Sequence, residues 1–249
     1  MLSLRSLQVF ILLLVLVFSL LSAAPARLIS YVLPEDQVIL QGVAGTVWDG
    51  RASRAMVRTP SGFLHLGAVD WSLSAASLLT LSPSLTVQSR WGSQRFTGEV
   101  KLRGETSYSL QDVESRFAAD LLRQFAPVAL AGYFDLQVAE LDIEDALPAQ
   151  GSGRLVWERA AWQAPRGPIA LGSYALDFAQ QDGGPLRGTV LTLSGPLEAE
   201  GQVEVNGRAY LIDILVRSDE PLDSQLSEAL MLMAAPEGDG YRLKLEGEF

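Results

Sequence analysis

Short stretches in which apolar and polar residues strictly alternate constrain the fold of this chain more than any other feature. Residues 139–144 (Ala-Glu-Leu-Asp-Ile-Glu) alternate without a break, and so do residues 202–206 and 242–246. Alternation with a period of two places apolar side chains on one face of a β-sheet and charged ones on the other. Glycine-bounded runs such as 98–104 and 188–195 have the length of single strands with turns at both ends. The sequence therefore predicts a mainly β protein with an antiparallel sheet and few helices.

Two stretches lack this alternation, and their apolar residues have the spacing of amphipathic helices. The first covers residues 110–125 and is followed by Pro127, and the second covers residues 222–233 and has Asp223 near its start. A third, shorter turn is predicted at 75–80. The apolar stripes consist of Val113, Phe117, Leu121 and Leu122 in the first helix and Leu222, Leu226, Leu230 and Met233 in the second.

An apolar segment near the N-terminus, Ser6–Ala24, contains no charged residue. A helix of about 20 apolar residues crosses the hydrocarbon core of a bilayer, which is about 30 Å thick. A soluble domain cannot easily bury a helix that is apolar on every side. The segment 6–24 is therefore predicted to be a transmembrane anchor that attaches the rest of the chain to a membrane.

A cleaved signal peptide is the alternative for this segment. Arg5 and the α-amine form a basic start, and Ala24-Pro25-Ala26 resembles a cleavage site, although the apolar run is long for a signal peptide. In both cases the positive-inside rule places residues 1–5 in the cytoplasm and the body of the chain on the other side of the membrane. Residues 25–37 are then a linker.

Composition narrows the possible partners and chemistry. The formal net charge is −10, which disfavours nucleic acid and anionic lipid headgroups as partners. The chain has no cysteine, which excludes disulfides and thiolate zinc sites.

The sequence also contains a weak internal repeat. The segment Gly45–Ala52 is similar to Gly153–Ala160, Leu66-Gly67 to Leu171-Gly172, and three further matches follow in the same order at a nearly constant offset. This order favours two duplicated halves, residues 38–143 and 148–249, each with a set of strands followed by a helix. Chance similarity is the alternative, since glycine next to apolar residues is common in β proteins. Residues 147–153 would join the two halves.

No residue pattern points to catalysis. His65 is the single histidine and alternates with Leu64 and Leu66 on an expected strand, and no nucleophile elbow, P-loop or dinucleotide fingerprint is present. Lys101 and Lys244 lie on alternating strands. The densest cluster of acidic residues consists of Glu140, Asp142, Glu144 and Asp145. Most of them are explained as the solvent-exposed face of one strand. The sequence predicts no enzyme and no catalytic, cofactor-binding or metal-binding residue, and it predicts that Trp48, Trp71, Trp91, Trp157 and Trp162 pack in the core.

One block of residues resembles a known family. Leu40-x-Gly-Val-x-Gly-Thr-Val-Trp48-x-Gly50-Arg-Ala52, followed by Val69-Asp-Trp-Ser-Leu73, resembles protein N of the type II secretion system. The stretches 132–136, 153–157 and 171–174 are also similar to that family, so the resemblance covers nearly the whole chain.

The resemblance implies a non-enzymatic, single-pass accessory component of the Gram-negative inner membrane. It would have a cytoplasmic N-terminus and a periplasmic domain, and would act in the export of folded proteins by contacting other secretion proteins. Two alternatives remain open. The β body is either a lipid- or amphiphile-binding groove, by analogy with other anchored β proteins, or an envelope hydrolase that uses His65 or the acids at 140–145.

Overall fold

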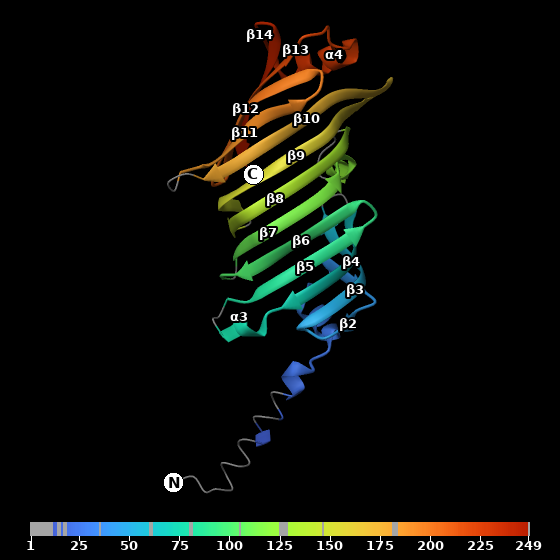
Figure 1. Cartoon of the computed structure of the whole chain (residues 1–249), viewed down its shortest axis with the longest axis vertical. Coiled ribbons are helices and arrows are strands. Elements are labelled where there is room, and N and C mark those ends of the chain that lie inside the picture. Colours follow the sequence, from blue (N-terminus) through green and yellow to red (C-terminus); the bar gives the residue numbers. More distant parts are fainter. Residues whose placement is uncertain are drawn as a thin grey trace.

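The computed structural model describes residues 12–13, 16, 19–34, 36–59, 62–79, 82–104, 106–124, 129–145, 147–180 and 184–248. These residues form one antiparallel sheet of 15 strands, which confirms the predicted mainly β class (Figure 1). The first strands are β1 (Val38–Gln41), β2 (Ala44–Gly45), β3 (Asp49–Thr59), β4 (Gly62–Leu73), β5 (Ser84–Trp91), β6 (Gln94–Leu102), β7 (Ser107–Ala118) and β8 (Leu130–Glu144). They are followed by β9 (Leu147–Ala164), β10 (Gly167–Gln180), β11 (Leu186–Ser194), β12 (Leu197–Asn206), β13 (Ala209–Ser218), β14 (Ala235–Glu237) and β15 (Gly240–Glu248).

The sheet is a meander in which nearly every strand pairs with the next strand along the chain. From β3 to β13 the order in the sheet is the order in the sequence, and β15 and then β14 follow β13. The strands are stacked along the long axis of the molecule, with the N-terminal segment at one end and β14 and α4 at the other (Figure 1). Among the described residues, no second sheet and no long helix packs over this sheet. The fold is therefore a single layer.

The helices are short. Those whose bounds the structure describes are η1 (Ala26–Leu28), α2 (Ile29–Val32), α3 (Ala75–Leu79), η2 (Ala119–Gln124) and α4 (Ser224–Met233). Residues 19–22 are helical as well. The helix predicted over 222–233 is confirmed by α4, and the turn at 75–80 by α3. Asp223 caps α4, because its carboxylate accepts a hydrogen bond of 2.8 Å from the backbone N–H of Gln225.

The helix predicted over 110–125 is wrong. Most of this segment is strand β7, and only residues 119–124 form the short 3-10 helix η2. A β-bulge explains the misleading pattern. Asp112 has a φ of 48°, so Leu110 and Val113 lie on the same face of the sheet although they are three residues apart. That spacing is the one expected on a helix.

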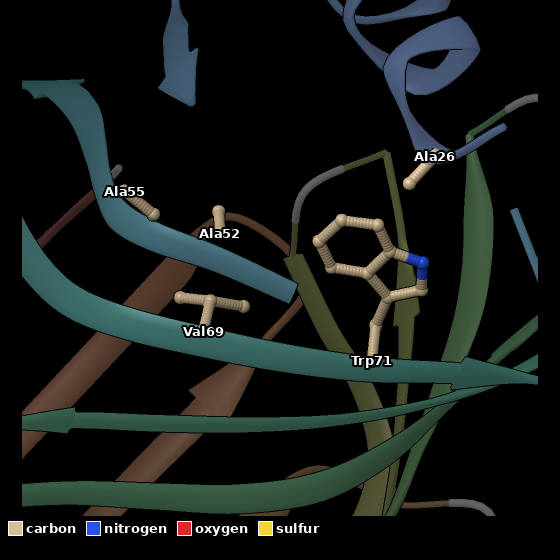
Figure 2. Packing of buried hydrophobic residues seen from close by; sticks show 5 residues of the cluster. All are labelled: Ala26, Ala52, Ala55, Val69 and Trp71. Carbon is tan, nitrogen blue, oxygen red and sulfur yellow. The ribbon is translucent and has the colours of Figure 1, made fainter. Parts of the chain in front are cut away.

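The best-packed core lies at the N-terminal end of the sheet, where Figure 2 shows Ala26, Ala52, Ala55, Val69 and Trp71. The indole N–H of Trp71 donates to the carbonyl of Val47 over 3.2 Å. Gly50 lies directly beside the ring, since an added Cβ would be 2.5 Å from it. The glycine and tryptophan of the family-like block are therefore packing partners.

The N-terminal segment is attached to this end of the sheet. Pro25 forms a β-bridge with Thr46, the N–H of Val47 donates to Ala24 O over 2.9 Å, and the indole N–H of Trp48 donates to Leu21 O over 2.8 Å. Ala26, within the expected linker 25–37, is only 1% exposed. The start of the expected linker is thus packed against the body.

The described part of the chain contains no helix with the length and apolar character of a membrane span. Residues 6–11, 14, 15, 17 and 18 of the expected anchor, and residues 1–5, lie outside the described residues.

The two expected halves have similar element orders. The strands β3 to β7, then η2 and β8, are matched by the strands β9 to β13, then α4 and β15. Among the described elements, β1, β2 and α3 of the first half and the short β14 of the second have no counterpart. Gly67 lies at a register shift between β3 and β4, and Gly172 lies at one between β9 and β10. Residues 147–153, the expected joint, form the start of β9 and pair with β8. The halves are thus joined edge to edge in one sheet.

Candidate functional site

One face of the sheet is apolar along nearly its whole length. Across β7 to β10, the opposed residues are Phe117, Phe134, Trp157 and Tyr174. The same face continues through β15. We call it the apolar face, and it includes Leu66, Val69, Trp71, Val87, Phe96, Val113, Phe117, Phe134, Leu136, Val138, Leu155, Trp157, Leu176, Phe178, Val190, Val203, Val205, Ile212, Ile214, Leu243 and Leu245.

The apolar face is only partly shielded from solvent. In β11 to β15 most of its large apolar residues are only partly buried and Leu245 is 41% exposed, although Leu197 at the start of β12 is buried. A sheet normally covers an apolar face with a second layer of structure. Large uncovered apolar surfaces of soluble domains mark sites for protein partners, membranes or apolar ligands. The apolar face is therefore the strongest candidate for a functional surface.

A row of aromatic rings crosses the middle of this face. Ring centroids are 5.4 Å apart between Phe117 and Phe134, 5.4 Å between Phe134 and Trp157, and 6.1 Å between Trp157 and Tyr174. The polar ends are satisfied within the chain: Trp157 donates to Ala131 O and Tyr174 donates to Leu171 O. Burial raises the pKa of Tyr174 to about 12. The row thus presents hydrocarbon rather than hydrogen-bonding groups.

The opposite face carries charges in cross-strand pairs. Arg116 forms ion pairs with Asp135 and Glu158, each at 2.8 Å, and the hydrogen bond that it donates to Glu158 contributes most to raising the pKa of Arg116. Arg242 bonds Asp213 at 2.7 Å and so lowers the pKa of that carboxyl. Exposed pairs of this kind contribute little stability. Their charges are hydrated, so this face of the sheet needs no covering layer.

A hollow of about 430 Å³ interrupts the apolar face in the first half of the sheet. Strands β4 to β7 and the turn η2 surround it. Its lining residues are Leu64, Leu66, Val69, Val87, Ser89, Gln94, Arg95, Phe96, Ser115, Arg116, Phe117, Leu121 and Leu122. The size is that of a small-molecule site, and most of the lining is hydrocarbon.

The outer edge of β15 is the second unusual feature. Its inner edge pairs with β13 from Tyr241 to Glu248, whereas β14 covers only residues 240–242 of the outer edge. Within the described part of the chain, residues 243–248 therefore have no neighbouring strand on that side. Unpaired N–H and C=O groups along such an edge are a template for another strand.

The residues weighed for catalysis are not brought together. His65 is exposed on β4, where its ring stacks on Trp91 at 5.7 Å, and strands β5, β6 and β7 separate it from the acids of β8. Arg103 binds Glu140 at 3.3 Å and Asp142 at 2.8 Å. The described residues contain no group of acids and histidine that could hold a metal ion. The sequence-based expectation that no residue is catalytic or metal-binding stays a prediction.

The predicted core role of the tryptophans is confirmed for Trp71 and wrong for Trp91, which is 44% exposed. The hollow and the aromatic row were not predicted. Their residues come from several consecutive strands and form no local motif within any one of them, so only the pairing of strands reveals them.

Comparison with known proteins agrees with the resemblance noted in the sequence. The family model described as type II secretion system protein N matches residues 36–244. The chain belongs to the type II secretion system protein N family. A protein of this name from Aeromonas hydrophila is 25% identical to the chain, and the alignment covers 86% of each sequence. One from Vibrio cholerae is also 25% identical, and that alignment covers 94% of each sequence. No solved structure matches the chain. As a member of the protein N family, it is a component of type II secretion.

Proposed function

We propose that this chain is a non-enzymatic scaffold of the type II secretion system, anchored in the inner membrane by residues 6–24, with residues 1–5 in the cytoplasm and the sheet in the periplasm. It would act there by contacting other secretion proteins. The family match supports the system, and the apolar segment supports the anchor. The observation that carries the contact role is the open edge of β15.

Docking at this edge would be β-augmentation, in which an extended segment of a partner adds a strand to a sheet. The backbone of residues 243–248 would supply hydrogen bonds, and Leu243 and Leu245 would offer apolar side chains on one side of the added strand. Anchoring both partners in one membrane would raise their effective concentration and so allow a modest interface to suffice.

In-cell photo-crosslinking from the β15 edge tests this role. A photoreactive residue at Glu246 should crosslink to another secretion component, whereas one at Thr189, in the middle of the sheet, should not. The proposal is refuted if Glu246 captures no secretion component and deletion of the gene leaves export of every type II substrate unchanged.

We infer that the two halves, 38–143 and 148–249, arose by duplication. The matching element orders support this, as does the position of η2 and α4, which each precede the last long strand of a half. Separate expression of the two halves tests whether each is a folding unit. Recovery of folded sheet from at least one half is the expected result.

A second candidate function is binding of a lipid or other amphiphile. The uncovered apolar face favours it, because such a surface gains free energy of roughly 25 cal/mol for each Å² that an apolar ligand covers. Native mass spectrometry of the full chain released from inner membranes should then show bound amphiphile. Absence of any bound amphiphile would contradict this candidate without affecting the secretion role.

A further inference from the structure

The charged residues of β15 are paired where β14 covers the strand and unpaired where it does not. In the covered stretch, Arg242 has a carboxylate on each neighbouring strand, Asp213 of β13 at 2.7 Å and Glu237 of β14 at 2.8 Å. The uncovered stretch has three exposed charged residues on the same face, which form no hydrogen bond or ion pair with any other described residue: Lys244, Glu246 and Glu248. The outer edge thus lacks the partners that β14 supplies at Arg242.

Lys244 indicates one of the missing charges. It lies opposite Asp213 on β13, but that carboxylate accepts hydrogen bonds from Nε and Nη2 of Arg242, at 2.7 and 3.0 Å. The ammonium group is therefore available to an acid on the outer side, from which Glu237 bonds Arg242. Opposite charges on neighbouring strands stabilise their pairing, and like charges destabilise it.

The pattern of β15 then specifies an added strand. An acid is favoured opposite Lys244 and a basic residue opposite Glu246 and Glu248, with apolar residues opposite Leu243 and Leu245 on the other face. Both neighbours of β15, β13 and β14, run antiparallel to it. An antiparallel segment passes residue 248 first and residue 243 last. Along its own sequence, its two basic residues therefore precede its acid.

The exposed end of α4 extends this surface. Residues 231–233 (Met-Leu-Met) are between 61% and 88% exposed. Only Ala234 separates them from Ala235, which pairs with Arg242 beside the start of the uncovered stretch. Exposed methionines adapt to partners of varied shape. A strand that ends opposite Leu243 thus reaches the end of α4, which favours an apolar residue just after the acid.

We propose that the outer edge of β15 and the end of α4 together bind an extended segment of another secretion protein. The segment runs antiparallel to β15 as an alternating strand in which two basic residues precede an acid and an apolar residue follows. The proposal rests on the docking role proposed above and adds the direction and the charge pattern of the bound segment. A segment with a net positive charge also suits a chain whose net charge is −10.

Photo-crosslinking in cells, with the crosslinked peptides mapped by mass spectrometry, tests the direction and the pattern. A photoreactive residue replaces Glu246 in one full-length variant and Leu232 in another. Both should capture the same protein, and the site captured from Leu232 should lie a few residues C-terminal to the site captured from Glu246. The mapped segment should contain the two basic residues and the acid.

The outcomes separate this proposal from the docking role. Capture from Glu246 but not from Leu232, a reversed order of the two sites, or a segment without the expected charges overturns the proposal and leaves docking at the edge standing. Absence of any capture from Glu246 overturns both.

Charge reversal tests the acidic contact. Lys244→Glu should lower capture from Leu232 about fivefold, because a repulsion between opposed strands replaces an attraction, whereas Lys244→Arg should preserve capture. Arg95→Glu is the matched control, since it makes the same change of charge at an exposed position on β6, where the opposed residues are Arg90 and Arg116. Equal capture in Lys244→Glu and Arg95→Glu contradicts the contact.

A charge swap distinguishes a lost contact from a weakened sheet. When the mapped acid of the partner is changed to lysine, capture by Lys244→Glu should recover most of its loss. A folding defect in this chain would not be repaired by a change in the partner. Failure of the swap to restore capture overturns the pairing of Lys244 with that acid.

Discussion

Gly50 lies against the ring of Trp71, where a methyl group has no room. An added Cβ would be 2.5 Å from the ring and 2.7 Å from the carbonyl of Thr46. We expect Gly50→Ala to lower the free energy of unfolding by about 2 kcal/mol, because overpacking a tight contact forces neighbours to shift. Gly104→Ala is the control, since its Cβ would meet nothing closer than 3.7 Å. Urea unfolding of both variants measures the difference, and equal midpoints would contradict the packing role.

The partly buried phenol of Tyr174 loses its proton only at an unusually high pH. Its pKa is raised to about 12, against about 10 for a free tyrosine. A raised pKa in the folded state contributes stability that is present below the unfolded value and is lost as the pH rises through the folded value. We therefore expect the wild-type chain to lose more stability between pH 10 and pH 12 than Tyr174→Phe does.

Thermal unfolding across that pH interval, followed by circular dichroism, provides the measurement. Tyr31→Phe is the control, because Tyr31 is 82% exposed. Parallel loss of stability in the wild type and in Tyr174→Phe would show that the phenol does not contribute.

At the level of elements, helix α4 depends on a single cap. The carboxylate of Asp223 accepts the N–H of Gln225, whose own side chain accepts the N–H of Arg166 in the β9–β10 turn. Asp223→Ala should cost about 1 kcal/mol, and Asp223→Ser should restore most of it because serine is also a good cap. Denaturant unfolding checks both values. Equal stability of the alanine and serine variants would contradict capping.

Strands were predictable from the sequence where alternation was unbroken, as at 139–144 in β8 and 242–246 in β15. Prediction failed in β7 because the bulge at Asp112, seen in its pairing with β6, shifts the alternation by one residue. Leu110, Val113 and Phe117 then have helical spacing while lying on one face of a sheet. A bulge depends on pairing with β6 and β8, so the local sequence does not reveal it.

Considered as a whole molecule, the candidate site is a property of the sheet rather than of any segment. Ser89 and Ser115 carry no sequence signal, and they form a hollow only because β5, β6 and β7 pair in one register. The edge of β15 is likewise open because β14 is only three residues long, and the sequence alone does not show where β14 ends. The sequence indicated the family and the polar face but not these surfaces.

The proposed anchor makes a prediction for the intact protein in cells. The full chain should remain in the inner-membrane fraction after carbonate washing, whereas a chain with a cleavable signal peptide in place of residues 1–20 should be recovered in the periplasm. Hydrophobic insertion of about 20 residues resists such washing. A mature wild-type protein whose N-terminal residue is Arg27 would contradict the anchor.

The attachment of residues 21–26 to the sheet has a mechanical consequence. Three contacts, at Thr46, Val47 and Trp48, hold the segment to the first strands, so the sheet has no free hinge at its base. In an anchored protein, each successive strand would then lie at its own level above the bilayer. Strands are about 4.8 Å apart, so the six strands β9–β13 and β15 add at most roughly 30 Å. Duplication of the unit would thus have set how far from the membrane the β15 edge meets its partner.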